Sequence, residues 1–163
     1  MIALKTIEPV VVQTILPRVI DELTARYFYE AATAYCRSNG YPKAAAYFEK
    51  EAKQENEHYM KWIKYLSDWN VVISFPPISQ PSAFTSLLDI LEKAYAMEYS
   101  LYESYEADTV KALPLCPGAF GIFQEYVQIQ NESVIEYNDK LTTAYNYIGT
   151  DPKLVLFESE NFD

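Results

Sequence analysis

The chain has few of the residues from which many small functional sites are built. It contains one histidine, His58, and two cysteines, Cys36 and Cys116, among 163 residues. The two cysteines lie far apart in sequence, so nothing indicates a disulfide framework, a zinc ribbon or a redox CxxC pair. This low cysteine usage fits a reducing compartment, and we expect a cytoplasmic protein.

Long hydrophobic runs are also missing. No stretch approaches the ~20 apolar residues that a membrane-spanning helix needs. The N-terminal segment MIALKTIEPVVVQTIL has an apolar patch, but it lacks a basic region and a small-residue cleavage site. We therefore expect an unprocessed protein without a membrane partner.

Positive charge is scarce as well. Thirteen lysines and arginines stand against 23 aspartates and glutamates, which gives a net charge of −10. This balance disfavours nucleic acids and anionic membranes as partners and favours cations. A well-solvated acidic surface without a specific partner would explain the charge equally simply.

The residues that are abundant predict a packed helical protein. Half of the chain is hydrophobic and its 15 tyrosines are spread throughout, as expected for one globular domain spanning residues 1–163. Apolar residues recur at helical spacing over four segments. These predicted helices cover residues 9–38, 42–67, 82–109 and 119–147, with Pro17 expected to bend the first or to mark a later start.

The segments between and after these helices define the topology. Residues 68–82 are rich in proline and β-branched residues, and Ser82 is the expected N-cap of the third helix. At ~3.3 Å per residue this segment spans ~45 Å, enough to cross the bundle and make the second and third helices parallel. The tail from Gly149 is either a short fifth helix or a loose end. The expected fold is an all-α four-helix bundle with a long crossover.

Each predicted helix carries a polar residue in its apolar stripe. On the second helix Phe48, Glu55 and Trp62 recur at intervals of seven, so Glu55 occupies a core position, and His58 falls on the same face. The full set is Glu22, Glu55 with His58, Glu98 and Gln130.

Buried carboxylates are costly unless they are paired, protonated or bound to cations. Three carboxylates, one imidazole and one amide would suit iron, manganese or zinc. A bridging Glu55 could hold two ions about 3.5–4 Å apart. In the alternative, the helices are rotated differently and the carboxylates reach solvent or pair with Arg18, Arg26 or lysines.

In the segments that carry these polar residues, the sequence resembles a known family, the ferritins, and the bacterial non-haem ferritins in particular. The similarity lies in IDELTARYFYEAATAYC, YFEKEAKQENEHYMKWIKYL, SLLDILEKAYAMEYSL and FQEYVQIQNES, and extends over about residues 13–160. The resemblance implies iron ligands at Glu22, Glu55, His58, Glu98 and Gln130, with Glu55 as the bridge. It also implies that a tyrosine at the site, Tyr29, takes part in the reaction.

Some positions depart from related groups. The fourth helix offers Gln130 and Ser133 where the symmetric di-iron bundles have Glu and His. Asn56 stands where bacterioferritins have a haem-ligating methionine, so the resemblance implies a di-iron protein without haem. The implied activity is a ferroxidase that uses O2 or hydrogen peroxide to oxidise Fe(II) and stores the product in a homo-oligomeric cage of 24 subunits.

Two other functions fit the same pattern. The first is a di-iron oxidase or peroxide-consuming protein that stores no iron, although a rubrerythrin would need a cysteine-rich domain that this chain does not have. The second is a structural shell subunit without catalysis. That alternative predicts missing ligands, whereas all five principal positions are filled.

Overall fold

The described part of the chain, residues 3–79, 83–147 and 151–162 of this computed structural model, contains five helices and no strand. The all-α prediction is confirmed, and the tail forms the short fifth helix. The helices are α1 (Pro9–Ser38), α2 (Pro42–Asp68), α3 (Leu87–Ala112), α4 (Pro117–Tyr145) and α5 (Asp151–Asn161). Within these described ranges no helix is long and apolar enough to cross a membrane.

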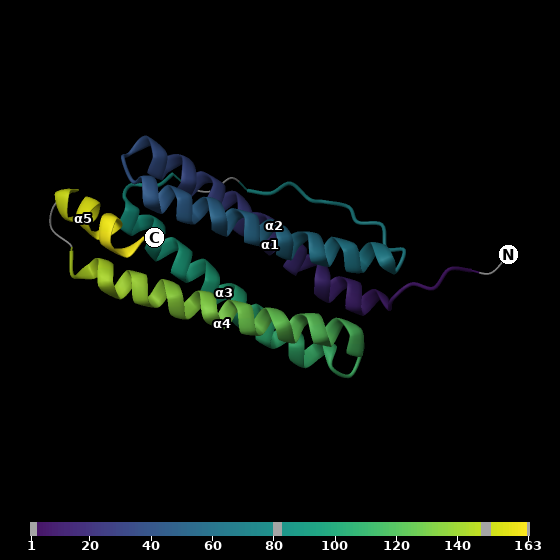
Figure 1. Cartoon of the computed structure of the whole chain (residues 1–163). Helices are drawn as coiled ribbons and strands as arrows, with labels where there is room; N and C mark the ends of the chain where they lie inside the picture. The colour runs from purple at the N-terminus through teal and green to yellow at the C-terminus, as the bar shows by residue number, and fades with distance from the viewer. Residues whose placement is uncertain (1–2, 80–82, 148–150, 163) are drawn as a thin grey trace.

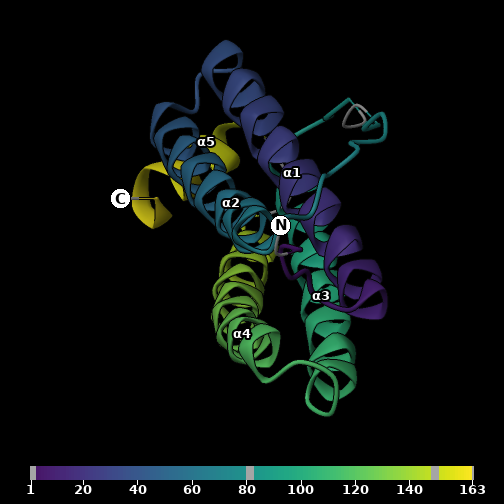
Figure 2. The same cartoon turned by 90° about the vertical axis from the view of Figure 1, so that its right-hand side faces the viewer.

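The four long helices form two antiparallel pairs. α1 packs along α2 and α3 packs along α4, with further contacts between α1 and α3 (Figure 1). The described residues that follow α2 run back along the outside of the bundle, and α2 and α3 run in the same direction, as the length of the connection predicts (Figure 1). α5 lies at the end of the bundle opposite the N-terminal segment, where it contacts α2 and α4 (Figures 1 and 2).

The third helix begins later than the sequence pattern predicts. It starts at Leu87, and its N-cap is Ser86, whose hydroxyl accepts a hydrogen bond from the Asp89 N–H at 3.0 Å. The Asp89 carboxylate in turn accepts from the Thr85 N–H at 2.9 Å. This reciprocal capping fixes the start of the helix. The expected cap, Ser82, lies outside the described residues.

Prolines open three of the helices. Pro9, Pro42 and Pro117 occupy first-turn positions, where the absent N–H would have no partner in any case. α4 therefore starts at Pro117, two residues before the predicted start, and it ends at Tyr145. Pro17 lies inside α1, which is continuous from Pro9, so the alternative of a later start is wrong.

The buried polar residues separate two apolar clusters. One cluster lies toward α5 and the other toward the turn between α3 and α4. On three helices the polar residue falls between the last member of one cluster and the first member of the other. These triplets are Ala52, Glu55 and Trp62 on α2, Ala94, Glu98 and Leu101 on α3, and Tyr126, Gln130 and Tyr137 on α4.

The C-terminal helix is anchored by a buried carboxylate. Glu158 on α5 is 3% exposed, and its Oε1 accepts hydrogen bonds from the N–H groups of Lys43 and Ala44, the latter at 3.0 Å. The side chain of Tyr41, the N-cap residue of α2, forms no capping hydrogen bond. Glu158 therefore caps the positive end of α2 from the other end of the chain.

Replacing Glu158 by alanine should destabilise the protein by about 1–3 kcal/mol, because the buried N–H of Ala44 and the partly buried N–H of Lys43 lose a charged acceptor. Urea unfolding followed by circular dichroism measures this loss. The matched control is Glu160→Ala on the same helix, since Glu160 is exposed and accepts a hydrogen bond from the hydroxyl of Tyr147. Equal stability losses in the two variants would contradict the capping role.

Candidate metal centre

The polar residues of the four stripes lie in the interior of the bundle. Glu22, Glu55, Glu98 and Gln130 are 0%, 4%, 0% and 1% exposed, and the His58 side chain is 18% exposed. The alternative in which the carboxylates reach solvent is therefore wrong.

The two arginines also have other partners. Arg18 pairs with Asp21 at 3.0 Å and with Asp108 at 3.4 Å. Arg26 bonds Glu30 and Asn56, both at 2.9 Å. No arginine pairs with Glu22, Glu55 or Glu98 among the described residues, so protons or a bound cation must compensate their charge.

Glu22, Glu55 and His58 come together at the contact between α1 and α2. One ligand atom from each lies within 4.8 Å of the others. His58 Nδ1 is 3.2 Å from Glu55 Oε2 and 3.4 Å from Glu22 Oε2. Residues three apart on α2 share a face, which explains why Glu55 and His58 both meet the carboxylate from α1.

Glu98 approaches this group from α3. Its Oε1 accepts a hydrogen bond from the hydroxyl of Tyr29 on α1, which is itself fully buried. Glu98 also interacts electrostatically with Glu55 and His58. Gln130 is buried on α4, but no described contact places its side chain against the other four residues.

Three buried oxygen atoms in these residues have no hydrogen-bond donor among the described residues. They are Glu22 Oε2, Glu98 Oε2 and Gln130 Oε1. Buried acceptors are almost always satisfied in native proteins, so three such atoms on residues of this kind need an explanation. Carboxylate and amide oxygens beside an imidazole suit divalent iron, manganese or zinc, and such a cation would satisfy them.

The electrostatics divide the carboxylates into two kinds. Burial and the nearby charges of Glu22 and other carboxylates raise the pKa of Glu55 well above its usual value, and burial together with Glu22 and Glu51 raises the pKa of Glu98 to about 8. Burial opposes ionisation of Glu22 too, but its interactions with His58, Glu55 and the hydroxyl of Tyr105 leave its pKa lowered.

Burial likewise opposes the charged form of His58, but the nearby carboxylate of Glu22 leaves the His58 pKa raised. Without a cation the site therefore holds protons at neutral pH.

Metal binding at this site should release protons and strengthen as the pH rises from 6 to 8. Glu55, Glu98 and His58 have raised pKa values and must lose their protons to bind a cation, whereas Glu22, with a lowered pKa, is already ionised. Zn(II) titration in weakly buffered solution with a pH indicator measures the release. An affinity that stays constant over this range would contradict the protonated site.

A cleft of about 360 Å³ connects the centre with the surface between α2 and α4. Its lining includes Glu55 and His58 together with Glu51 and the exposed Glu132 and Glu136. These carboxylates line the cleft from its exposed mouth to the metal centre, and their negative charge would attract cations into it.

Sequence reasoning missed one contact of the centre. The spacing of seven residues on α3 predicts only a core position for Tyr105, but its hydroxyl donates a hydrogen bond to Glu22 Oε1. The signal was present in the sequence, because Tyr105 follows Glu98 by seven residues and shares its face. The pattern cannot say which neighbour such a hydroxyl meets.

Comparisons with known proteins identify the family of this chain. The family model named Ferritin, described as a ferritin-like domain, matches residues 18–144. A bacterial non-heme ferritin of Campylobacter jejuni is 28% identical over 124 residues, covering 75% of this chain and 74% of the relative. The ferritin-2 heavy chain of Schistosoma mansoni is 31% identical over 129 residues, covering 74% of each.

Solved structures show the same fold at lower identity. An open pore ferritin from the archaeon Archaeoglobus fulgidus matches with a TM-score of 0.85 at 19% identity, over 95% of this chain and 96% of that one. An engineered closed form of the same ferritin also gives 0.85 at 19% identity, over 96% of each chain. With the family model matching most of its length, this chain belongs to the ferritin family.

Proposed function

We propose that this protein is a ferroxidase that oxidises Fe(II) at a di-iron site within each subunit and stores the Fe(III) product in a homo-oligomeric cage. The observation that carries this proposal is the group formed by Glu22, Glu55 and His58, whose ligand atoms lie within 4.8 Å of one another. Buried oxygens of Glu22, Glu98 and Gln130 without a donor among the described residues support it. Membership of the ferritin family supports it independently. The whole chain acts as one domain in this function, in the cytoplasm.

Each residue of the centre has a definite role in this proposal. Glu22 and His58 bind one Fe(II), and Glu98 with Gln130 binds the other. Glu55 bridges the two ions, in keeping with its electrostatic coupling to both Glu22 and Glu98. Gln130 is neutral, so the second ion is held by less negative charge and binds more weakly.

The reaction balances with the oxidants expected for such a site. Two Fe(II) ions lose one electron each, and O2 accepts these two electrons with two protons to become hydrogen peroxide. Hydrogen peroxide can equally accept two electrons and two protons to become two water molecules. Tyr29 contributes by donating its hydroxyl hydrogen bond to Glu98, which keeps that carboxylate in place during turnover.

Storage is supported by charge and by the named relatives. The net charge of −10 is repeated in every subunit of an assembly, which would concentrate cations near it. The relatives are a bacterial non-heme ferritin and a ferritin heavy chain. We propose a shell of 24 subunits without haem.

Size and iron content test this function together. The protein is loaded with Fe(II) in air and separated by gel filtration with detection of iron and protein. Iron that co-elutes with a particle of hundreds of kilodaltons supports storage. A monomer or dimer that oxidises Fe(II) without retaining it would indicate a di-iron oxidase instead, and a large particle that does not accelerate oxidation would indicate a structural shell subunit.

A further inference from the structure

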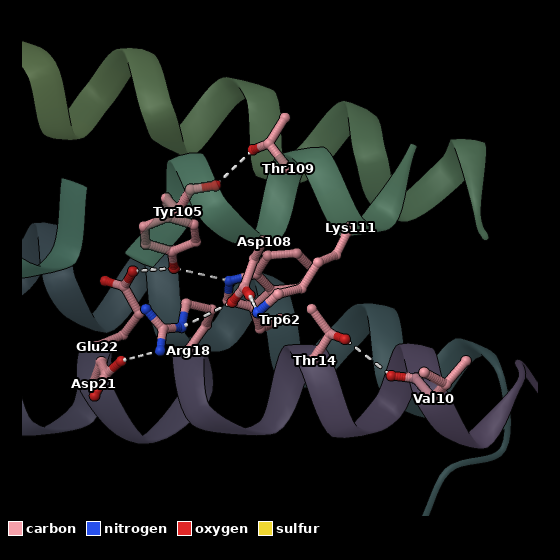
Figure 3. Close-up of polar contacts among 10 residues, drawn as sticks. All are labelled: Val10, Thr14, Arg18, Asp21, Glu22, Trp62, Tyr105, Asp108, Thr109 and Lys111. Carbon is pink, nitrogen blue, oxygen red and sulfur yellow. Dashed lines mark hydrogen bonds and ion pairs between the residues drawn. The ribbon is translucent and has the colours of Figure 1, made fainter. Parts of the chain in front are cut away.

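A chain of three buried side chains leads from α2 through α3 to the carboxylate on α1. The indole Nε1–H of Trp62 donates a hydrogen bond to the hydroxyl oxygen of Tyr105 at 3.0 Å, and the Tyr105 hydroxyl donates to Glu22 Oε1 (Figure 3). All three residues are 0% exposed. These two hydrogen bonds connect α2 and α3 to Glu22 on α1.

The direction of these hydrogen bonds is fixed by chemistry. An indole N–H is a donor only, so Tyr105 must accept from Trp62. The phenolic proton is then free to point at Glu22, which accepts it on Oε1. Trp62 therefore makes Tyr105 a donor toward Glu22. The other oxygen of this carboxylate, Oε2, has no hydrogen-bond partner in the described part of the chain.

The ring of Tyr105 is held in place from several sides. The guanidinium carbon of Arg18 lies 5.8 Å from the ring centroid, and the ring of Tyr126 lies at 5.1 Å. Arg18 is itself anchored to Asp21 and Asp108 (Figure 3). A ring packed in this way cannot swing its hydroxyl away from Glu22 without disturbing its neighbours.

We propose that Tyr105, oriented by Trp62, is a positioning residue that holds Glu22 by one oxygen and presents only Oε2 to the metal. This inference rests on the proposed di-iron function. Tyr29 holds Glu98 in a comparable way, with Glu98 Oε2 left free. The Glu22 arrangement has an additional donor behind the tyrosine, which defines the carboxylate orientation before the metal arrives.

The positioning role predicts weaker metal binding at the position formed by Glu22, and not at the position formed by Glu98. Outer hydrogen-bond partners of metal ligands typically contribute 10- to 100-fold to affinity. Tyr105→Phe removes the hydroxyl and keeps the ring, so it should weaken Co(II) binding at the Glu22 position by about 10- to 100-fold. Trp62→Phe keeps the Tyr105 hydroxyl but removes the donor that directs its proton toward Glu22. This variant should therefore also weaken Co(II) binding, but by less than Tyr105→Phe.

Anaerobic calorimetric titration with Co(II) provides the measurement, because it needs no turnover. Tyr105→Phe and Trp62→Phe are each also combined with Glu98→Gln. The Glu98→Gln change weakens the second metal position, so the titration then reports on the position formed by Glu22, Glu55 and His58. The control is Tyr65→Phe, which removes a hydroxyl that contacts Cys116 at 3.3 Å, beside the same aromatic cluster. Thermal unfolding of each metal-free variant measures any change in folding separately.

The outcomes separate the two proposals. Weaker binding at one position, with the other position and the Tyr65→Phe control unchanged, supports the positioning role. Wild-type affinity in Tyr105→Phe overturns that role and leaves the di-iron proposal intact, as does a loss of thermal stability without a loss of affinity. Wild-type protein that binds no Co(II) overturns both.

Discussion

Replacing Glu55 and His58 together by alanine is expected to slow aerobic Fe(II) oxidation by more than about 100-fold, since loss of outer partners alone can cost that much in metal sites. The two substitutions remove the proposed bridge and the imidazole ligand. The rate of Fe(III) formation, followed by absorbance after Fe(II) is added in air, gives the measurement. The bundle should remain folded, because both side chains lie between the apolar clusters and belong to neither.

A matched control separates ligand loss from a general loss of negative charge. Glu57 lies on the same helix between the two ligand residues, and its side chain is exposed. Glu57→Ala should oxidise Fe(II) at a rate within a few-fold of the wild type. Unchanged kinetics in the Glu55→Ala and His58→Ala double variant would show that the oxidation site is elsewhere.

Much of the fold follows from the sequence because the helices are long and strongly periodic. Intervals of seven identify the apolar stripe of each helix, and the same intervals identify the polar residues that break it. The long connection after α2 then requires parallel second and third helices. Glu22, Glu55, Glu98 and Gln130 were accordingly assigned to the interior, and all four are buried.

Helix starts and caps that depend on side-chain hydrogen bonds cannot be predicted from the spacing of apolar residues. The start of α3 is decided by side-chain hydrogen bonds of Ser86 and Asp89, whereas the apolar pattern continues beyond them. The cap of α2 comes from Glu158, more than a hundred residues away in sequence. Periodicity gives the face of a residue, but the partner that it meets depends on the rotation of the opposing helix.

The same limit explains why the sequence pattern predicts only a core position for Tyr105. Tyrosines at stripe positions usually contribute apolar area, and this chain has 15 tyrosines. What distinguishes Tyr105 is a carboxylate on α1 and an indole on α2 at opposite sides of its hydroxyl. Neither relation is visible within a single helix.

Replacing Glu98 by glutamine should stabilise the metal-free protein, although it weakens metal binding. The structure keeps Glu98 fully buried, and its pKa is raised to about 8 from an ordinary value of 4.5. Between these values the folded state holds a proton that the unfolded state has released, so the free energy of unfolding falls as the pH rises. A glutamine carries no such charge, and its amide oxygen can still accept from Tyr29.

The difference in stability between this variant and the wild type should therefore depend on pH. It should be small near pH 4.5, grow by up to about 1.4 kcal/mol per pH unit and reach about 2–4 kcal/mol at pH 8. Urea unfolding of metal-free protein at several pH values measures it. The matched control is Glu106→Gln on the same helix, since Glu106 accepts from the hydroxyl of Tyr102 but is exposed.

A gain that appears only in Glu98→Gln, and only as the pH rises, would show that the carboxylate is kept in the core at a cost to stability. A gain independent of pH would contradict the raised pKa as its cause. Added Zn(II) should reverse the order of stability, because the cation binds the folded wild type more tightly than the variant. The buried carboxylate then stabilises the protein only when it holds a metal, which is what a binding site in a helical core requires.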